Sequence, residues 1–178
     1  MSPRAFGPCA VLCVATALFS ACGSKATPAQ PASATPRSAP LHFRYALTDG
    51  RTWLTSDALR GKPALLSFLT TYDLISQAQA RFLNGIAQRR GKQVQVAAIV
   101  LESVENRPLM VAFHDGLELA YPLAIADADV ISGEGPFGDV HVVPTTVVLD
   151  AEGRLVWKNV GLAREEAIED VLGSLGGG

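Results

Sequence analysis

The sequence predicts an α/β domain in which a central mixed sheet is flanked by helices. Short apolar runs of strand length alternate along the chain with longer segments whose apolar residues recur at helical spacing. A strand, a turn and a second strand then precede a closing amphipathic helix, which is the order of a β-α-β unit followed by a hairpin. The length of 178 residues allows one such domain together with additional segments.

Each expected element follows from a local pattern. Residues 64–69 form a continuously apolar run after Gly61-Lys62-Pro63, which indicates a buried strand. Residues 74–90 place apolar side chains at helical spacing and are followed by Gly91, a common helix stop. Residues 150–153, Asp-Ala-Glu-Gly, indicate the turn of a hairpin. The other expected elements are strands over residues 94–100, 145–149 and 154–157, and helices over residues 105–114 and 164–175.

Residues 1–21 are expected to be a signal peptide. They contain one basic residue, Arg4, and continue as a nearly unbroken apolar run over residues 8–21. This run is too short for a membrane-spanning helix, which needs about 20 apolar residues, but it suits a signal sequence. Residues 18–22, Leu-Phe-Ser-Ala-Cys, are similar to a bacterial lipobox. The similarity implies cleavage before Cys22 and a lipid on its sulfur; ordinary cleavage after Ala21 without a lipid is the alternative.

Residues 22–40 are expected to be the lipidated cysteine and a disordered linker. The segment is rich in Ala, Ser, Thr and Pro and cannot bury enough apolar surface to fold. Acyl chains such as palmitate on Cys22 would anchor it stably to a membrane. The globular domain is therefore expected over residues 41–178, in the cell envelope, on the extracytoplasmic side of the inner or outer membrane.

Cysteine usage and charge exclude several functions. The three cysteines are Cys9, Cys13 and Cys22; the first two leave with the signal peptide and the third carries the lipid. The expected mature chain therefore has no thiol and forms no disulfide. The net charge of -2, without a basic stretch, argues against nucleic acid as a partner.

Two segments carry a specific resemblance. Residues 59–72, Leu-Arg-Gly-Lys-Pro-Ala-Leu-Leu-Ser-Phe-Leu-Thr-Thr-Tyr, resemble the opening of the membrane-anchored TlpA/ResA-type redoxins. Residues 137–156, which include Val-Pro-Thr-Thr and Asp-Ala-Glu-Gly, resemble a second block of that family at the family spacing. The resemblance covers the chain from about residue 41 to its end and implies a thioredoxin-like fold.

The chain departs from this family at the redox motif. The family's Cys-Pro-x-Cys is replaced by Asp73-Leu74-Ile75-Ser76, so that Asp73 and Ser76 stand at the two cysteine positions. Disulfide exchange needs an attacking thiolate and a second, resolving thiol, and neither a carboxylate nor a hydroxyl can replace them. No catalytic residue is therefore expected. Asp73 is expected to cap the helix over residues 74–90, because aspartate is among the best N-cap residues.

The resemblance also implies a binding groove beside Asp73. The family's equivalent of Pro144 is cis and faces the active site, while the backbone before it pairs with a substrate chain. We therefore expect a cis Val143–Pro144 bond and a polypeptide-sized groove. Whether Leu74 and Ile75 join the core or an exposed rim stays open. The expected groove residues are Tyr72, Asp73, Leu74, Val143, Pro144 and Thr145.

Other residues give weak signals. The histidines at 42, 114 and 141 are scattered, and residues 127–135 form a small acidic loop whose spacing matches no EF-hand. No metal or cofactor is expected. A pair between His141 and Asp73 is conceivable, but a solvated loop histidine is the commoner case. Nothing supports a hydrolase built from Ser76, His141 and Asp73.

Three interpretations of function follow. The first is a non-catalytic module that binds a protein or peptide of the cell envelope in the inherited groove. The second is a member of the thiol-disulfide oxidoreductase family with residual or partner-dependent activity, in which Asp73 acts as a base. The third is a structural or accessory lipoprotein whose contacts lie elsewhere.

Overall fold

A computed structural model describes residues 39–175 of the chain. Five strands form one sheet in the order β5-β4-β3-β6-β7, and two further strands, β1 and β2, form a separate hairpin. The strands are β1 (Arg44–Ala46), β2 (Trp53–Thr55), β3 (Ala64–Leu69), β4 (Gln95–Val100), β5 (Leu123–Ile125), β6 (Thr145–Leu149) and β7 (Leu155–Val160). The helices are α1 (Leu74–Arg90), α2 (Arg107–Gly116), α3 (Ala128–Ile131) and α4 (Glu165–Leu175), with 3-10 helices η1 (Asp57–Leu59) and η2 (Val104–Asn106).

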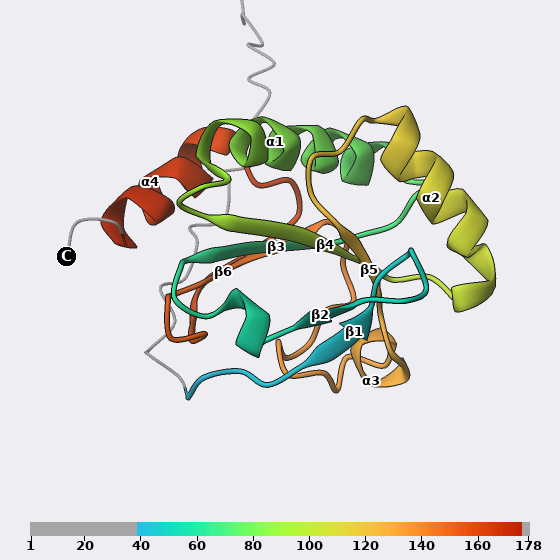
Figure 1. The fold of residues 1–178 in the computed structure, drawn as a ribbon, viewed down its shortest axis with the longest axis horizontal. Coiled ribbons are helices and arrows are strands. Elements are labelled where there is room, and N and C mark those ends of the chain that lie inside the picture. The colour runs from blue at the N-terminus through green and yellow to red at the C-terminus, as the bar shows by residue number, and fades with distance from the viewer. Residues whose placement is uncertain (1–38, 176–178) are drawn as a thin grey trace, which may run out of the picture. The chain divides into compact units, whose positions relative to one another are not determined.

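The five-stranded sheet is mixed and lies between two layers (Figure 1). β3 pairs in parallel with β4, and β4 with β5, whereas β6 runs antiparallel to both β3 and β7. Helices α1, α2 and α4 cover one face, where they contribute Leu83, Met110 and Ile168 to a buried apolar cluster. The β1–β2 hairpin and α3 cover the other face, where Tyr45 and Val130 belong to a second cluster. The expected α/β class, with a mixed sheet flanked by helices, is confirmed.

The strongest sequence patterns match the observed elements closely. β3 and α1 have the expected bounds, because β3 is buried at every position and α1 is capped by Asp73 and Gly91. β4 and α4 each begin one residue later than expected, and β7 continues to Val160 instead of ending at residue 157. The second helix begins at Arg107 rather than residue 105, because η2 occupies residues 104–106 before it.

The sequence patterns did not indicate five short elements. Strands β1, β2 and β5 have three residues each, α3 has four and η1 has three. A segment of three or four residues is too short to display a periodic pattern. Tertiary contacts place them instead: Leu47 forms a bridge with Ala124, which ties the β1–β2 hairpin to the sheet edge.

The expected signal peptide, Cys22 and most of the linker lie outside the described residues. Within residues 39–175, no helix is both long and apolar enough to cross a membrane.

Candidate functional site

Three loops meet at the carboxyl end of β3. The loop of residues 70–73 follows β3 and leads into α1, and Thr145 opens β6 opposite Phe68 of β3. The Gly161 N–H donates to the Pro144 carbonyl at 2.8 Å, which joins the loop after β7 to the loop before β6. The Ala163 N–H donates to Gln79 Oε1 at 2.7 Å and so ties the same loop to α1. These bonds join the loops that carry the expected groove residues.

Asp73 caps the N-terminus of α1, as the sequence predicts. Its Oδ2 accepts a hydrogen bond from the Ser76 N–H at 2.8 Å, and its Oδ1 accepts from the Ile75 N–H at 3.3 Å. These bonds stabilise the ionised carboxylate, and the bond from the Ser76 backbone N–H is the main reason that the pKa of Asp73 lies below its ordinary value. A carboxylate with a lowered pKa is a weak proton acceptor, so the local geometry suits capping better than general-base catalysis.

Ser76 is fully buried and faces the protein interior. Its Oγ accepts a hydrogen bond from the Thr70 N–H at 3.3 Å, which ties the first turn of α1 to the end of β3. The side chain has no exposed surface, and its interaction with the Asp73 carboxylate helps to lower the pKa of Asp73. The structure thus places Asp73 and Ser76 differently, with Asp73 partly exposed at the helix start and Ser76 buried beneath it.

Glu102 is a buried acid that sequence reasoning missed. It follows β4, is 6% exposed, and its Oε1 accepts from the Thr71 N–H at 2.6 Å and the Thr71 hydroxyl at 2.8 Å. Asn106 Nδ2 donates to its other oxygen at 3.2 Å. Glu102 therefore holds the loop that presents Tyr72 and Asp73. The sequence signal that could have found it is an acid immediately after the apolar run of β4. An acid beside a buried strand is expected to be buried, and buried acids occur almost only with hydrogen-bonding or charged partners.

Large apolar side chains surround Asp73 and are open to solvent. Tyr72 is 76% exposed and Leu74 is 77% exposed, and Ile75 is also exposed. Leu74 and Ile75 thus form a rim and are not part of the core, which settles the choice that the sequence left open. Val142 and Leu162 expose further apolar surface on the two neighbouring loops. We call the exposed surface of Tyr72, Leu74, Ile75, Val142 and Leu162 the rim face.

The peptide bond between Val143 and Pro144 is cis, the geometry that the resemblance implies. Pro144 and Thr145 are buried and Val143 is half-buried. The Thr145 hydroxyl donates to the Val142 carbonyl at 2.6 Å and closes the loop. Among the described residues, the Val143 N–H and carbonyl have no backbone hydrogen-bond partner.

Some residues with candidate chemistry lie apart from Asp73. His141 pairs with Asp139 at 3.0 Å rather than with Asp73. Asp127 caps α3 by accepting from the Val130 N–H at 3.0 Å, so part of the expected acidic loop is helical. Within residues 39–175, no group of three or more His, Cys, Asp and Glu side chains is placed to hold a metal ion.

Comparisons with known proteins show the fold of the domain. No family model and no curated protein matches the sequence, but solved structures match clearly. A secreted thiol-disulfide isomerase from Corynebacterium glutamicum aligns with a TM-score of 0.70 at 16% identity, over 82% of this chain and 92% of that one. A secreted disulfide oxidoreductase from Mycobacterium tuberculosis gives 0.63 at 20% identity, over 75% and 96%. An exposed lipoprotein thioredoxin from Streptococcus pneumoniae gives 0.62 at 21% identity, over 76% and 100%.

These likenesses show that the chain has the thioredoxin-like fold of the thiol-disulfide oxidoreductases. The expected fold class is therefore confirmed. Each of these matches is 21% identical or less, so the activity of the relatives does not follow from the likeness alone. The described domain carries the same scaffold without a cysteine in residues 39–175.

Proposed function

We propose that the domain is a non-catalytic docking module that binds an extended segment of an envelope protein at the rim face. The observation that carries the proposal is the exposure of Tyr72 and Leu74 on either side of Asp73, whose carboxylate cannot exchange disulfides. Exposed apolar side chains that gather on one surface are typical of protein interaction sites. The Val143 backbone supports the same function, since it has no backbone partner among residues 39–175 and an extended segment could pair with it as an added strand.

A residual enzyme is the second candidate, and the site supports it less well. A general base works best when its pKa lies near the operating pH, whereas hydrogen bonding lowers the pKa of Asp73. Ser76 is fully buried, so a substrate cannot reach its hydroxyl from solvent. An accessory lipoprotein with contacts elsewhere remains the third candidate, and the experiment below separates it from docking.

We also propose that the domain lies outside the cytoplasm and is anchored through a lipid on Cys22. The similarity of residues 18–22 to a lipobox supports the anchor. Two of the similar structures belong to secreted proteins and one to an exposed lipoprotein, which supports an extracytoplasmic location. Metabolic labelling with a palmitate analogue tests the anchor: the native chain should incorporate the label and Cys22→Ala should not.

Covalent capture tests the docking function. The full chain is expressed in its own cell envelope with p-benzoylphenylalanine in place of Leu74, and the irradiated adducts are identified by mass spectrometry. The same side chain in place of Leu109 is a matched control, because Leu109 is 58% exposed but lies on α2, outside the rim face. We expect one discrete protein adduct from position 74 that is absent from position 109.

The change Val143→Arg then tests whether capture depends on the cis-proline loop. Its long charged side chain should obstruct the Val143 backbone, so the adduct at position 74 should disappear. An adduct that persists with this change, or one that forms equally from both positions, contradicts docking at the rim face. Either result favours the accessory-lipoprotein alternative.

A further inference from the structure

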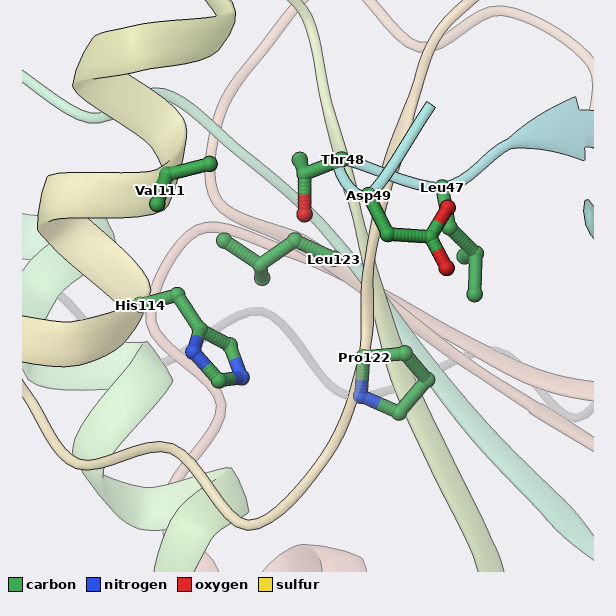
Figure 2. A pocket seen from close by; sticks show the side chains of 7 residues that line it. All are labelled: Leu47, Thr48, Asp49, Val111, His114, Pro122 and Leu123. Carbon is green, nitrogen blue, oxygen red and sulfur yellow. The ribbon is translucent and has the colours of Figure 1, made fainter. Parts of the chain in front are cut away.

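A cavity unrelated to the rim face lies at the β5 edge of the sheet (Figure 2). It has a volume of about 300 Å³ and opens between α2, the start of β5 and the loop after β1. The lining residues are Leu47, Thr48, Asp49, Val111, His114, Pro122 and Leu123, none of which belongs to the rim face. The volume is at the lower end of the range of small-molecule sites.

The walls of this cavity are mainly apolar and are fixed in place. Leu123 is 1% exposed and belongs to the buried cluster under α2. The Thr48 N–H donates to the Leu123 carbonyl at 3.0 Å, and Leu47 forms its bridge with Ala124. These bonds hold the loop after β1 against the sheet edge. The cavity is therefore a preformed recess with apolar walls, as in most small-molecule sites.

Two polar side chains line this recess from different elements. Figure 2 shows the Thr48 hydroxyl directed toward Leu123, and the His114 ring on the other side of Leu123, extending toward Pro122. The Asp49 carboxylate turns away and accepts from the Arg51 N–H at 2.7 Å within its own turn. The recess therefore offers a hydroxyl and an imidazole to an occupant, but no directed charge.

The neighbour of His114 determines which hydrogen bonds its ring can make. His114 Nδ1 lies 3.2 Å from Asp115 Oδ1. In the tautomer that makes this contact a hydrogen bond, Nδ1 carries the proton, because an ionised carboxylate only accepts hydrogen bonds. In the neutral imidazole, Nε2 is then an acceptor. The Thr48 hydroxyl can donate, so the recess combines one acceptor and one donor above an apolar floor.

We propose that this recess binds a small apolar molecule that carries one hydroxyl group, as in a phenol or an alcohol. The occupant's O–H donates to His114 Nε2, its oxygen accepts from the Thr48 hydroxyl, and its apolar body packs on Leu123 and Val111. The proposal is independent of docking at the rim face.

Two near-isosteric probes, p-cresol and p-xylene, test this proposal on the full chain by NMR. We expect p-cresol to cause saturable shifts of the Val111 and Leu123 methyl signals and of the His114 Nε2 signal. Because a single hydrogen bond contributes about a fivefold difference in affinity, p-cresol should bind at least about fivefold more tightly than p-xylene. Thr48→Val and His114→Phe should each reduce this preference without abolishing the methyl shifts.

Val111→Phe should fill the recess and abolish binding of both probes, whereas Leu109→Phe, on the same helix but outside the lining of the recess, should not. If Val111→Phe does not fold, the two polar variants decide the matter. The proposal is overturned if p-cresol causes no saturable shift at these methyl groups. It is also overturned if both probes bind equally to the native chain, or if folded Val111→Phe still binds them.

Discussion

Removal of the Asp73 side chain should destabilise the domain by about 1 kcal/mol. The bond from the Ser76 N–H is 2.8 Å long, whereas the bond from the Ile75 N–H, at 3.3 Å, is longer than the usual range. One strong bond is therefore lost. Leu74 is 77% exposed, so water reaches the freed amides and limits the cost. In a domain of this size, about 1 kcal/mol lowers the thermal midpoint by roughly 3–5 °C.

Urea denaturation followed by tryptophan fluorescence measures this effect for Asp73→Ala and Asp73→Asn. Asparagine caps as well as aspartate, so Asp73→Asn should keep most of the stability that Asp73→Ala loses. The acid dependence gives a second signature. The pKa of Asp73 is lower in the folded state than in the unfolded state. The ionised carboxylate therefore contributes its full stabilisation above the pKa of the unfolded state. This stabilisation is lost as the pH falls through the pKa of the folded state. If Asp73→Ala is as stable as the native chain, or if Asp73→Asn is as damaging as Asp73→Ala, the capping role is refuted.

Three further predictions concern the buried acid Glu102, the turn at Asp49 and the core residue Leu83. Glu102→Ala should cost about 1–3 kcal/mol, because the Thr71 amide loses a buried acceptor; hydrogen exchange of that amide should accelerate, and Glu102→Gln should restore part of its protection. The Asp49 carboxyl should titrate with a pKa of about 2, chiefly because the Thr52 hydroxyl donates to it. Thr52→Val should raise this pKa toward its ordinary value, as measured by carbon-13 NMR titration. An unchanged pKa would contradict the role of the Thr52 hydroxyl. Leu83→Ala should cost about 2–5 kcal/mol in urea denaturation, because it opens a cavity at a fully buried position; a loss below about 1 kcal/mol would contradict tight packing there.

The sequence predicted those parts of the fold in which local pattern and burial agree. β3 is buried at all its positions, so its continuous apolar run was sufficient. α1 has apolar residues at helical spacing between Asp73 and Gly91, so both of its ends were predictable. β5 has only three residues and depends on pairing with β4, which no local pattern can indicate. Short elements of this kind are determined by tertiary contacts.

The candidate site was predictable only in part, because its arrangement also depends on tertiary contacts. The resemblance identified the positions of Asp73 and Ser76, but the burial of Ser76 is a property of the packed helix. Glu102 acts through Thr71, which lies 31 positions earlier in the chain, so its role appears only in the folded domain. The recess between His114 and Thr48 likewise exists because α2 packs beside the loop after β1.

Introducing cysteines at positions 73 and 76 tests the central proposal most directly, that the domain is a polypeptide-binding scaffold without redox chemistry. The measurement is reduction of insulin by dithiothreitol, catalysed by the native chain, by Asp73→Cys with Ser76→Cys, and by the same double variant with Val143→Arg. We expect the native chain to be inactive and the double variant to be active, because the helix N-terminus at position 73 favours a thiolate. Val143→Arg should suppress that gain. Insulin reduction by the native chain would contradict the proposal that it has no redox activity. A double variant that folds but is inactive would contradict the proposal that the rim face binds a polypeptide.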